Sequence, residues 1–534
     1  MRTLLAINFN HDGSAVILRD GRMVAFVNTE RFSRKRRHPG IREQELQALL
    51  QQAGLDLRDL DYVLLCNLGD MDSPEIAARF GTDLKETWFA FSLNDERTSV
   101  QIGGQTLPCQ VNPDHHSLHA ACAFFSSGFD EAMVFTSDPT GYGVFMGKAG
   151  RLERLQLELP PFRAPNLYTD VALELFGSAL AGAGKVMGLA PFGGRAADNP
   201  SEAELAGLGS YQRLLGLADG EPCFVEFGAK RWNARLAWLV QETLNVQLSR
   251  VLRCLREECA RRGLEPNLCL GGGTALNSVA NQLAFERSGF DALHLHPACG
   301  DDGTALGAAL WYWHAQLGMP RLCWRDQQLM YSCARYDEQV ARSVERAGNR
   351  IRVEAVRSAP RAAAELLAAG RVIGWFCGAS EIGPRALGHR SILADPRRAE
   401  MKVRLNEQVK RREAFRPFAP AVLEEQAEAW FGVRNSPFML RVAPVLQRGV
   451  PAVTHVDGTA RVQTVARDES PEFYELIDHF YALTQVPMVL NTSFNADGEP
   501  IVETPDDAIA CFLDTGLDAL VFPQVVVLRG GCWI

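Results

Sequence analysis

The chain has 534 residues, more than one hydrophobic core usually organises, so we expect two or more domains. Hydrophobic residues make up 47% and charged residues 22%, as in soluble globular proteins, and the net charge of −9 disfavours a nucleic-acid binder that works by broad phosphate neutralisation. The thirteen cysteines include no CxxC pair, no signal-peptide pattern precedes the strand-like residues 4–9, and no apolar run has the length of a membrane helix. We therefore expect a soluble, cytoplasmic protein with reduced thiols.

A strand–turn–strand pattern occurs twice in the first 151 residues. Residues 4–9 are largely apolar, 10–14 are a polar turn, and the strand 15–18 ends at Asp20-Gly21. The same order returns with an apolar run at 133–136, a turn at 137–141, a strand at 144–146 and a turn at 149–151. Glycine and aspartate favour such hairpin turns. The repetition predicts either two copies of one unit or a coincidence of common hairpins.

Two glycine-rich turns follow, each between a short strand or loop and a helix. Leu268-Cys269-Leu270 leads into Gly271-Gly272-Gly273 and a helical pattern that starts near Asn277. Gly300-Asp301-Asp302-Gly303 precedes the helical residues 305–310. Glycine lets a ligand approach the backbone, and a helix N-terminus offers N–H groups to phosphate. Together with the repeated hairpins, these turns predict a duplicated α/β fold whose halves clamp a nucleotide.

Composition changes near residue 330. Residues 331–351 are polar and charged, and a new α/β pattern begins with a helix at 361–369 and a strand at 372–376. We place a domain boundary here, giving domains of residues 1–330 and 331–534. The segments 67–104 and 196–220 are predicted to be insertions without a recognisable motif.

Three histidines lie within five residues, in the stretch from Asp114 to His119. His115 and His119 are four residues apart and share one face if the segment is helical, whereas His116 points elsewhere. Such a pair on its own is often two surface histidines. With Asp138 in the second hairpin and Asp301 in the glycine turn as partners, the four side chains predict a site for iron, zinc or manganese.

The first hairpin loop carries His11 and Asp12, where a duplicated fold would place the reacting end of a nucleotide. His11 is predicted to be either a general base towards a hydroxyl or a cap of the turn. Lys185 stands in the glycine-bounded stretch from Gly184 to Gly188, which we predict to be a turn beside phosphate oxygens. The sequence there is not a Walker A motif, and the alternative for Lys185 is an ordinary surface lysine.

A basic stretch in the second domain runs from Arg385 to Arg416, with ten lysines or arginines and four acids. Part of it, around residues 402–412, fits a solvated helix face. Arg385 and Arg416, however, are flanked by prolines, glycines and apolar residues, where guanidinium groups bind anions well. Together with Lys410, they predict a phosphate site.

Two further stretches belong with the basic one. Residues 455–461 form a turn that presents hydroxyl and guanidinium groups. Residues 490–495 follow an apolar strand with amides and hydroxyls, among them Asn491 and Ser493, that suit a small planar ligand. The alternative for the latter is an ordinary strand end with an Asx turn.

These motifs resemble a known family. The HHxxH stretch at 115–119, GKVMGLAP at 184–191, GGGTALN at 271–277 and GDDGTALGAA from 300 are similar to the carbamoyltransferases of antibiotic biosynthesis and nodulation-factor modification. So are GPRALGHRSILADPR at 383–397, VKRREAFRPFAP at 409–420, HVDGTARVQTV at 455–465 and LNTSFN at 490–495. The resemblance covers essentially the whole chain.

The resemblance implies an α/β protein with a duplicated ASKHA (actin/sugar-kinase-like) N-terminal domain and a YrdC-like C-terminal domain. The second domain is expected to form carbamoyl adenylate from carbamoyl phosphate and ATP with Mg²⁺, and the first to pass the carbamoyl group to a small-molecule alcohol. The resemblance also implies a homodimer. The net charge and the lack of a long apolar run predict that neither nucleic acid nor a membrane is a partner.

It further implies roles for individual residues. The expected metal ligands, with iron as the metal, are His115, His119, Asp138 and Asp301. The expected catalytic residues are His11, Asp12, Arg385 and Lys410, and the expected nucleotide and carbamoyl phosphate contacts are Lys185, Gly188, Gly272, Gly273, Asn277, Arg416, Asn491 and Ser493.

Three other functions stay open at this point. A sugar-kinase-type phosphotransferase or ATPase would use the first domain alone and leave the basic stretch without a purpose. A nucleotide-sensing regulator would tolerate loss of His11. Threonylcarbamoylation of tRNA is disfavoured by the negative charge. The sequence does not identify the acceptor alcohol.

Overall fold

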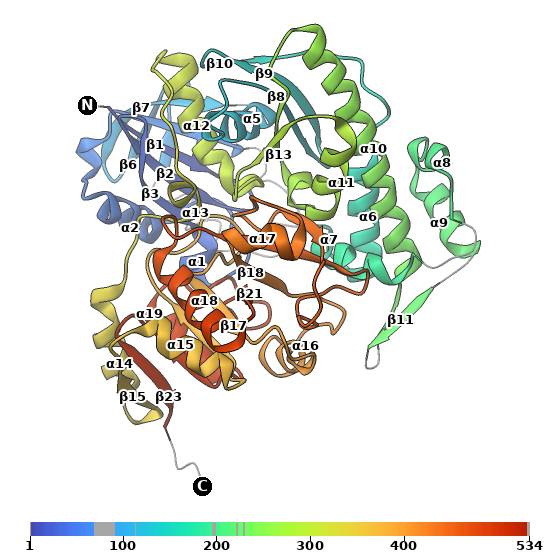
Figure 1. Cartoon of the computed structure of the whole chain (residues 1–534). Coiled ribbons are helices and arrows are strands. Elements are labelled where there is room, and N and C mark those ends of the chain that lie inside the picture. Colours follow the sequence, from blue (N-terminus) through green and yellow to red (C-terminus); the bar gives the residue numbers. More distant parts are fainter. Residues whose placement is uncertain are drawn as a thin grey trace.

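The computed structural model describes residues 2–68, 91–94, 96–112, 114–194, 199–220, 223–227 and 230–530. Its strands form two larger sheets in the first 295 residues, a small two-stranded sheet, and a nine-stranded sheet in the remainder. Figure 1 shows the two large N-terminal sheets in the upper part of the molecule and the nine-stranded sheet in the lower part, next to the C-terminus.

The first sheet has the strand order β3-β2-β1-β4-β7-β6-β5. The hairpins β1–β2 and β2–β3 are antiparallel, and β4 and β7 then add parallel to β1. The strands are β1 Thr3–Asn8, β2 Ser14–Arg19, β3 Arg22–Asn28, β4 Tyr62–Cys66, β5 Phe91–Leu93, β6 Ser99–Ile102 and β7 Gln105–Asn112.

The second sheet repeats this arrangement, with the order β10-β9-β8-β13-β14. Its β8–β9 and β9–β10 hairpins are antiparallel, and β13 and β14 follow in parallel. The strands are β8 Glu131–Asp138, β9 Gly141–Lys148, β10 Arg151–Arg154, β13 Asn267–Gly271 and β14 Ala292–Leu295. The predicted duplication is therefore confirmed, and the α/β class with it.

Helices α5 (His115–Ser126) and α12 (Thr304–Trp311) share one apolar core with both sheets. Alternate side chains of each first strand face opposite ways, as a pleated strand requires. Leu4 and Ala6 of β1 meet these helices, whereas Leu5 and Ile7 join a core that includes α2 (Glu43–Ala53). The carboxyl end of β8 and the N-terminal ends of α5 and α12 consequently meet between the two halves.

The outer face of the second sheet is covered by a larger helical layer, seen at the upper right of Figure 1. Its members are α6 Ala164–Phe176, α7 Ala179–Leu189, α8 Glu202–Ala206, α9 Tyr211–Gly220, α10 Ala234–Arg261 and α11 Ser278–Ser288, with the two-stranded sheet β11 Phe224–Phe227 and β12 Lys230–Asn233. The described part of the predicted insertion at 196–220 is thus helical. Of the other, 67–104, residues 69–90 lie outside the described residues.

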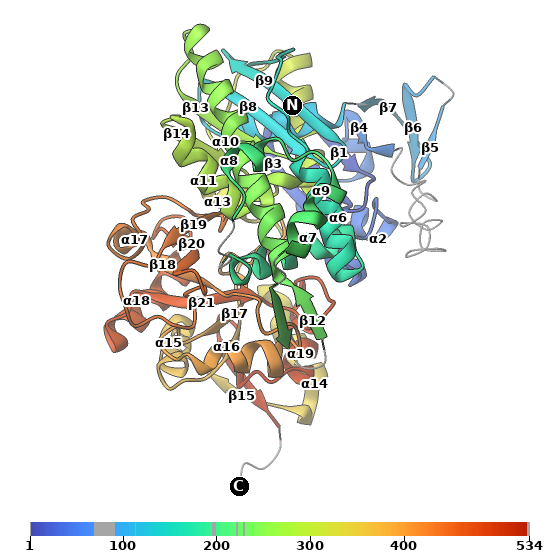
Figure 2. The same cartoon turned by 90° about the vertical axis from the view of Figure 1, so that its right-hand side faces the viewer.

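The C-terminal sheet has the order β15-β23-β22-β16-β17-β21-β18-β20-β19 and mixes parallel with antiparallel pairs. Its strands are β15 Ile351–Ala355, β16 Ile373–Phe376, β17 Arg390–Ala394, β18 Ala419–Leu423, β19 Arg441–Pro444, β20 Thr459–Val465, β21 Met488–Ser493, β22 Ala519–Val521 and β23 Val525–Arg529. The accompanying helices are α14 Val340–Ala347, α15 Ala359–Ala368, α16 Glu400–Arg404, α17 Glu424–Phe431, α18 Pro471–Thr484 and α19 Pro505–Asp514. Figure 2 shows them around this sheet.

The polar segment 331–351 is not a plain linker, because α14 lies within it and packs on α19. Its amphipathic pattern was hidden among charged residues, and its apolar side includes the buried Val340 and Ala347. The helix α13 (Asp326–Met330) and the segment after it run along the boundary of the two parts.

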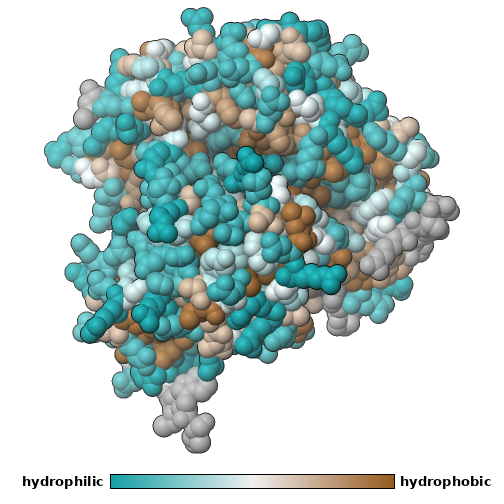
Figure 3. Space-filling view, in the orientation of Figure 1, coloured by the Kyte–Doolittle hydropathy of each residue, from teal (hydrophilic) through white to brown (hydrophobic). Residues whose placement is uncertain are grey.

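Figure 3 shows the surface in the orientation of Figure 1: hydrophilic residues cover most of this face, and apolar residues lie in patches between them. Among the described residues, no single helix combines the length and apolarity of a bilayer span. Only the bent pair Ala164–Phe176 and Ala179–Phe192, at 89° to each other, does so jointly.

Candidate active site

Two histidines of the N-terminal part face each other on the first turns of α5. Asp114 is the N-cap of this helix, and its side chain accepts a hydrogen bond from the backbone N–H of Ser117. His115 and His119 lie one turn apart, and their Nε2 atoms are 3.1 Å from each other. His119 is buried. The predicted shared helix face is therefore confirmed.

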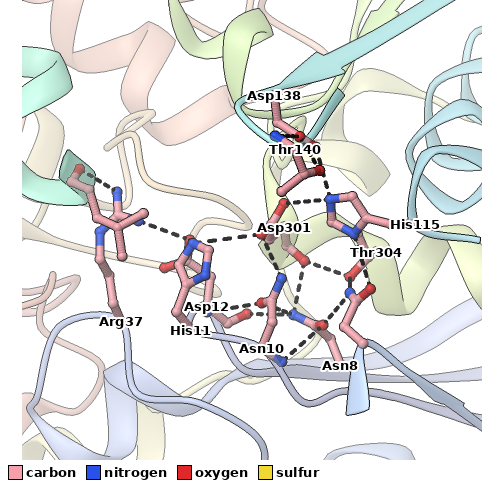
Figure 4. A network of polar contacts seen from close by, with 12 residues as sticks. Asn8, Asn10, His11, Asp12, Arg37, His115, Asp138, Thr140, Asp301 and Thr304 are labelled. Carbon is pink, nitrogen blue, oxygen red and sulfur yellow. Dashed lines mark hydrogen bonds and ion pairs between the residues drawn. The ribbon is translucent and has the colours of Figure 1, made fainter. Parts of the chain in front are cut away.

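Two carboxylates from other elements approach the same point (Figure 4). Asp301, in the turn before α12, has its Oδ1 3.1 Å from His119 Nε2 and 3.5 Å from His115 Nε2. Asp138, at the end of β8, has its Oδ2 3.0 Å from His115 Nε2. Within the described residues, the ligand atoms of His115, His119 and Asp301 all lie within 4.8 Å of one another. Two imidazole nitrogens and the Asp301 carboxylate form a converging donor set that fits a transition metal, and Asp138 lies beside it through its contact with His115.

Neighbouring amides hold these ligands in place. His115 Nδ1 lies 3.0 Å from Asn67 Oδ1, a contact that fixes the ring with its Nε2 towards Asp138 and His119. Asn10 Nδ2 donates to Asp301 Oδ2 at 2.5 Å, and Asn8 Nδ2 donates to the Asp301 carbonyl at 3.0 Å. No role was predicted for these three asparagines from the sequence. Their only signal was the close spacing of Asn8 and Asn10 in a hairpin loop.

The pKa values of three acids in this cluster shift in different directions, because their neighbours differ. Hydrogen bonds from His115 and Thr140 outweigh burial and lower the pKa of Asp138 to about 2. The surrounding histidines likewise outweigh burial and lower the pKa of Asp301. Burial and the negative charges of Asp12 and Asp301 instead raise the pKa of Asp302 well above its usual value. Asp138 and Asp301 are thus held as carboxylates, the form that binds a cation.

His11 and Asp12 lie beside the cluster, on the loop between β1 and β2. His11 Nε2 is 3.3 Å from Asp12 Oδ2 and 3.6 Å from Asp301 Oδ2. Burial lowers the pKa of His11, but the two carboxylates outweigh it and raise the value to about 9. His11 therefore carries a proton at neutral pH in this arrangement, whereas a general base needs a neutral ring. The base role stays a prediction.

The glycine turn after β13 touches the other side of the cluster. Gly272 has φ +83°, and a Cβ there would stand 2.4 Å from the carbonyl oxygen of Ser137, so this close approach to β8 requires glycine. Asn277 is the N-cap of α11 and also donates to Gln241 at 3.0 Å. The nucleotide contacts predicted for Gly272, Gly273 and Asn277 remain predictions.

The prediction of a turn around Lys185 is wrong, because this residue lies inside helix α7. The glycines that bound it are tolerated in the helix, and Gly188 allows close packing, since a Cβ there would be 3.3 Å from Pro417. Lys185 Nζ pairs with Glu413 Oε1 at 2.7 Å. The segment thus lies at the contact between the two parts. A phosphate contact for Lys185 and Gly188 remains a prediction.

A second cluster, which we call the basic cluster, consists of Arg385, Lys410, Arg412, Arg416 and Arg461 in the C-terminal part. Arg461 interacts electrostatically with three of the other arginines, and burial together with this repulsion lowers its pKa well below the usual value. Burial and neighbouring cations lower the pKa of Lys410 and Arg412 in the same way. The acids that act on Arg412 and Arg416 are Glu413 and Asp497. So dense a positive cluster calls for an anionic ligand.

Several polar atoms at this cluster are buried without a hydrogen-bond partner among the described residues: Arg385 Nε, Arg461 Nε and Asn491 Oδ1. Asn491 Nδ2 donates to the carbonyl of Ala386, the neighbour of Arg385, at 3.1 Å and to Gln463 Oε1 at 2.8 Å. Gln463 and Arg461 are two apart on β20 and therefore share one face of the strand. Unsatisfied buried donors and acceptors of this kind indicate a ligand site.

Lys410 has its ammonium against the loop after β21. Its Nζ donates to the Ser493 carbonyl and to Asn495 Oδ1, both at 2.5 Å, and lies 3.2 Å from Ser493 Oγ. Lys410 therefore connects the end of β21, at Ser493, with the loop that follows it, as well as adding positive charge to the cluster.

The short helix α1 (Thr29–Ser33) and the loop that follows it connect the two clusters; we call residues 29–38 together the arginine loop. Arg31 is buried and donates to the carbonyl of Gly383 at 2.8 Å, and Arg34 donates to the carbonyl of Ile501 at 2.7 Å. Arg36 Nε donates to the Glu499 carbonyl at 2.9 Å, and the positive charge of Arg36 acts on Lys410. The next residue, Arg37, pairs with Asp12 Oδ2 at 3.4 Å. No role was predicted for this loop from the sequence, although it contains a run of basic residues.

Comparison with known proteins covers both parts of the chain. The family model described as carbamoyltransferase N-terminus matches residues 3–208 and 231–310, and the one described as carbamoyltransferase C-terminus matches residues 364–529. Nodulation protein NolNO of Sinorhizobium fredii is 34% identical over 98% of this chain and 79% of that protein. An uncharacterized protein of Synechocystis sp. is 32% identical over 99% of this chain and 97% of that protein.

Solved structures are more distant. HypF of T. kodakarensis shares 11% identity and a TM-score of 0.32, over 61% of this chain and 49% of that chain. Component A of (R)-2-hydroxyglutaryl-CoA dehydratase from Acidaminococcus fermentans shares 13% identity and a TM-score of 0.33, over 58% of this chain and 97% of that chain. The matches to the two halves of one family span most of the sequence, and the chain therefore belongs to the carbamoyltransferase family.

Proposed function

We propose that this carbamoyltransferase is an ATP-dependent O-carbamoyltransferase with two centres. The basic cluster makes carbamoyl adenylate from carbamoyl phosphate and ATP, and the histidine–aspartate cluster passes the carbamoyl group to a hydroxyl of a small molecule. The observation that carries this proposal is the basic cluster, in which Lys410 is buried and the four arginines are half-buried, together with its unpartnered polar atoms. A phosphotransferase that used the N-terminal sheets alone would have no need of it.

The basic cluster suits the reactants of the first step. Carbamoyl phosphate and ATP are both anions that repel each other, and fixed guanidinium groups hold two anions together at little reorganisation cost. The unpartnered Nε atoms of Arg385 and Arg461 are donors for phosphate oxygens. The unpartnered Oδ1 of Asn491 is an acceptor, which suits the NH₂ of the carbamoyl group.

The proposed reaction has three steps. Water takes up the phosphoryl group of carbamoyl phosphate, which leaves carbamate and inorganic phosphate. A carbamate oxygen then attacks the α-phosphorus of ATP, a P–O bond to pyrophosphate breaks, and carbamoyl adenylate forms. Finally the acceptor oxygen attacks the carbamoyl carbon, the C–O bond to AMP breaks, and the hydroxyl proton leaves to a base.

For the last step we assign the histidine–aspartate cluster. His115, His119, Asp138 and Asp301 would hold a metal ion, for which we propose iron. Such an ion supplies positive charge for the departing phosphate and orients the carbamoyl group. His11 and Asp12 lie on the side of the cluster that faces the arginine loop. There they would accept the proton that leaves the acceptor hydroxyl.

The arginine loop supports a direct passage from one centre to the other. Carbamoyl adenylate is a mixed anhydride that bulk water would hydrolyse, so making and using it inside one protein protects it. The adjacent residues Arg36 and Arg37 reach the basic cluster and Asp12, respectively. Two cations in this position suit an anionic intermediate on its way between the centres.

The products of ATP test the proposal. We expect purified protein, ATP, Mg²⁺ and carbamoyl phosphate to give AMP, pyrophosphate and inorganic phosphate, resolved by ³¹P NMR, with no AMP when carbamoyl phosphate is left out. Formation of ADP, or ATP turnover that is indifferent to carbamoyl phosphate, would instead support a phosphotransferase and overturn the proposal.

A further inference from the structure

An ion pair joins helix α7 of the N-terminal part to the loop that carries Arg412 and Arg416 of the basic cluster. Lys185 Nζ lies 2.7 Å from Glu413 Oε1, and this ammonium stands 5.5 Å from the centre of the Phe176 ring. Both charged side chains are half-buried, so their attraction is screened less than that of a surface pair. Burial raises the pKa of Glu413, but hydrogen bonding to Lys185 outweighs it and lowers the value, so Glu413 is a carboxylate at neutral pH.

Glu413 lies between this lysine and two arginines of the basic cluster. Its other oxygen, Oε2, is 3.8 Å from Arg416 Nη1, which is beyond hydrogen-bond distance. The negative charge of Glu413 also acts on Arg412. Lys185 is the one of these three cations that stands outside the basic cluster, and it holds the carboxylate through Oε1. Without the ammonium, a movement of about 1 Å would give Glu413 a charged hydrogen bond to Arg416.

The backbone of the loop around Glu413 is fixed by groups other than Lys185. Asn406 is buried, and its Nδ2 donates to the carbonyls of Ala414 and Arg416 at 3.3 and 3.1 Å. The backbone N–H of Arg416 donates to the carbonyl of Glu413 at 3.1 Å, which closes the turn. Loss of the Lys185 charge should therefore change the partner of the Glu413 side chain and leave the fold of the loop intact.

We infer that Lys185 is a positioning residue for the basic cluster: it holds the Glu413 carboxylate and so keeps the Arg416 guanidinium available to a phosphate group. The N-terminal part thereby completes the anion site of the C-terminal part, because Lys185 belongs to α7. This inference rests on the proposed function, since the phosphate group is that of ATP or carbamoyl phosphate. It differs from a direct phosphate contact of Lys185, because here the lysine acts through Glu413.

Binding of the two anions tests this role. Dissociation constants of ATP with Mg²⁺ and of carbamoyl phosphate are measured separately by isothermal titration calorimetry in each variant. Lys185→Met removes the charge and keeps a long side chain beside Phe176. It should weaken the binding of at least one of the two anions about tenfold, as expected for the loss of one charged hydrogen bond. Lys185→Arg keeps the charge and should restore binding of both anions.

The double variant Lys185→Met/Glu413→Gln separates an indirect role of the lysine from a direct one. A neutral amide attracts Arg416 far less than a carboxylate does, so the double variant should bind both anions within about twofold of the wild type. Glu413→Gln alone should bind them at least as tightly as the wild type. If Lys185 bound phosphate directly, the double variant would stay as weak as Lys185→Met.

Lys148→Met is the control, because Lys148 forms a pair of similar length with Glu131, at 2.8 Å, between β9 and β8 and outside the basic cluster. It should bind both anions as the wild type does. Unchanged binding in Lys185→Met, weaker binding in Glu413→Gln, or no recovery in the double variant would each overturn the inference.

The proposed function is followed separately, by carbamoyl-phosphate-dependent exchange of pyrophosphate into ATP. A wild type that binds the anions without this exchange would overturn the proposed function, while the binding constants of the variants would still decide the role of Lys185. A wild type that bound neither anion would overturn both.

Discussion

Asp301 is the residue on which the histidine–aspartate cluster depends. One carboxylate oxygen meets the two histidines of α5, and the other accepts from Asn10 and faces His11. The residue is fixed by its own carbonyl, which accepts from Asn8 and from Thr304 Oγ1. A carboxylate constrained in this way has little conformational freedom left, so binding a cation would cost little further entropy.

Removing the negative charge of Asp301 should lower the affinity of the cluster for a metal ion. We predict that Asp301→Asn lowers the metal bound after loading with Fe²⁺ or Mn²⁺ at least about tenfold, because a neutral amide is a weaker ligand than a carboxylate. Metal content measured by mass spectrometry checks this without an activity assay. Asp302→Asn is the matched control, since Asp302 is not among the converging ligands, and it should retain the metal. Equal metal content in the two variants would contradict the assignment.

Arg461 offers a residue-scale test of the basic cluster. Arg461→Lys keeps the charge but loses the planar fork of donors, so we predict about 10- to 100-fold slower exchange of pyrophosphate into ATP, equivalent to the loss of one or two buried charged hydrogen bonds. Arg467→Lys changes an arginine that stacks on Tyr474 at the surface and should exchange at the wild-type rate. Normal exchange in Arg461→Lys would place the anion site elsewhere.

At the scale of elements, the arginine loop is held in a strained form. Arg34 and Arg37 have φ of 59° and 58°, in the left-handed region that arginine seldom adopts. Contacts on both sides of the loop offset this strain. Arg31 and Arg34 donate hydrogen bonds to backbone carbonyls of the C-terminal part. Arg37 forms an ion pair with Asp12 and donates a hydrogen bond to the carbonyl of Leu180.

The contacts of the loop predict that substitutions of the neighbouring residues Arg36 and Arg37 slow different steps of the reaction. Arg36→Ala should slow pyrophosphate exchange, because Arg36 acts on Lys410, Arg412 and Arg416. Arg37→Ala should spare exchange and slow carbamoyl transfer about tenfold, because it removes the partner of Asp12. The ratio of the two rates, measured in each variant, checks the division. If both variants moved the ratio the same way, the loop would not join two separate steps.

The two N-terminal sheets and the start of α5 were predictable because their signals are local. Alternating apolar residues, the turns around residue 12 and residue 140, and the spacing of His115 and His119 each act within a few residues. The contacts of Asn67 with His115 and of Arg31 with Gly383 depend on chain packing and left no pattern in the sequence. Lys185 was misplaced because two glycines inside a helix look like a turn.

At the scale of the whole molecule, buried neutral histidines make stability depend on pH. Burial lowers the pKa of His294 to about 3 and of His296 and His389 to about 4, below the usual 6.5. The unfolded chain therefore binds more protons than the folded chain between about pH 6.5 and 4, and the free energy of unfolding should fall as the pH falls through this window.

Urea midpoints measured from pH 7 to pH 4.5 test this dependence. The wild-type midpoint should decrease steadily, and His296→Asn should flatten the decrease, because the asparagine oxygen can accept from the Ala298 N–H as Nδ1 does now but does not titrate. Each buried imidazole contributes up to about 3 kcal/mol over the window. A wild-type midpoint that stayed constant or rose towards pH 4.5 would contradict neutral burial of these histidines.

The separation of the two half-reactions is the most direct test of an enzyme with two centres. Pyrophosphate exchange into ATP and transfer of labelled carbamoyl to an acceptor are measured side by side in Arg385→Ala and His11→Asn. We predict that Arg385→Ala loses both exchange and transfer, whereas His11→Asn retains exchange and loses transfer. Loss of exchange in His11→Asn, or retained exchange in Arg385→Ala, would contradict it.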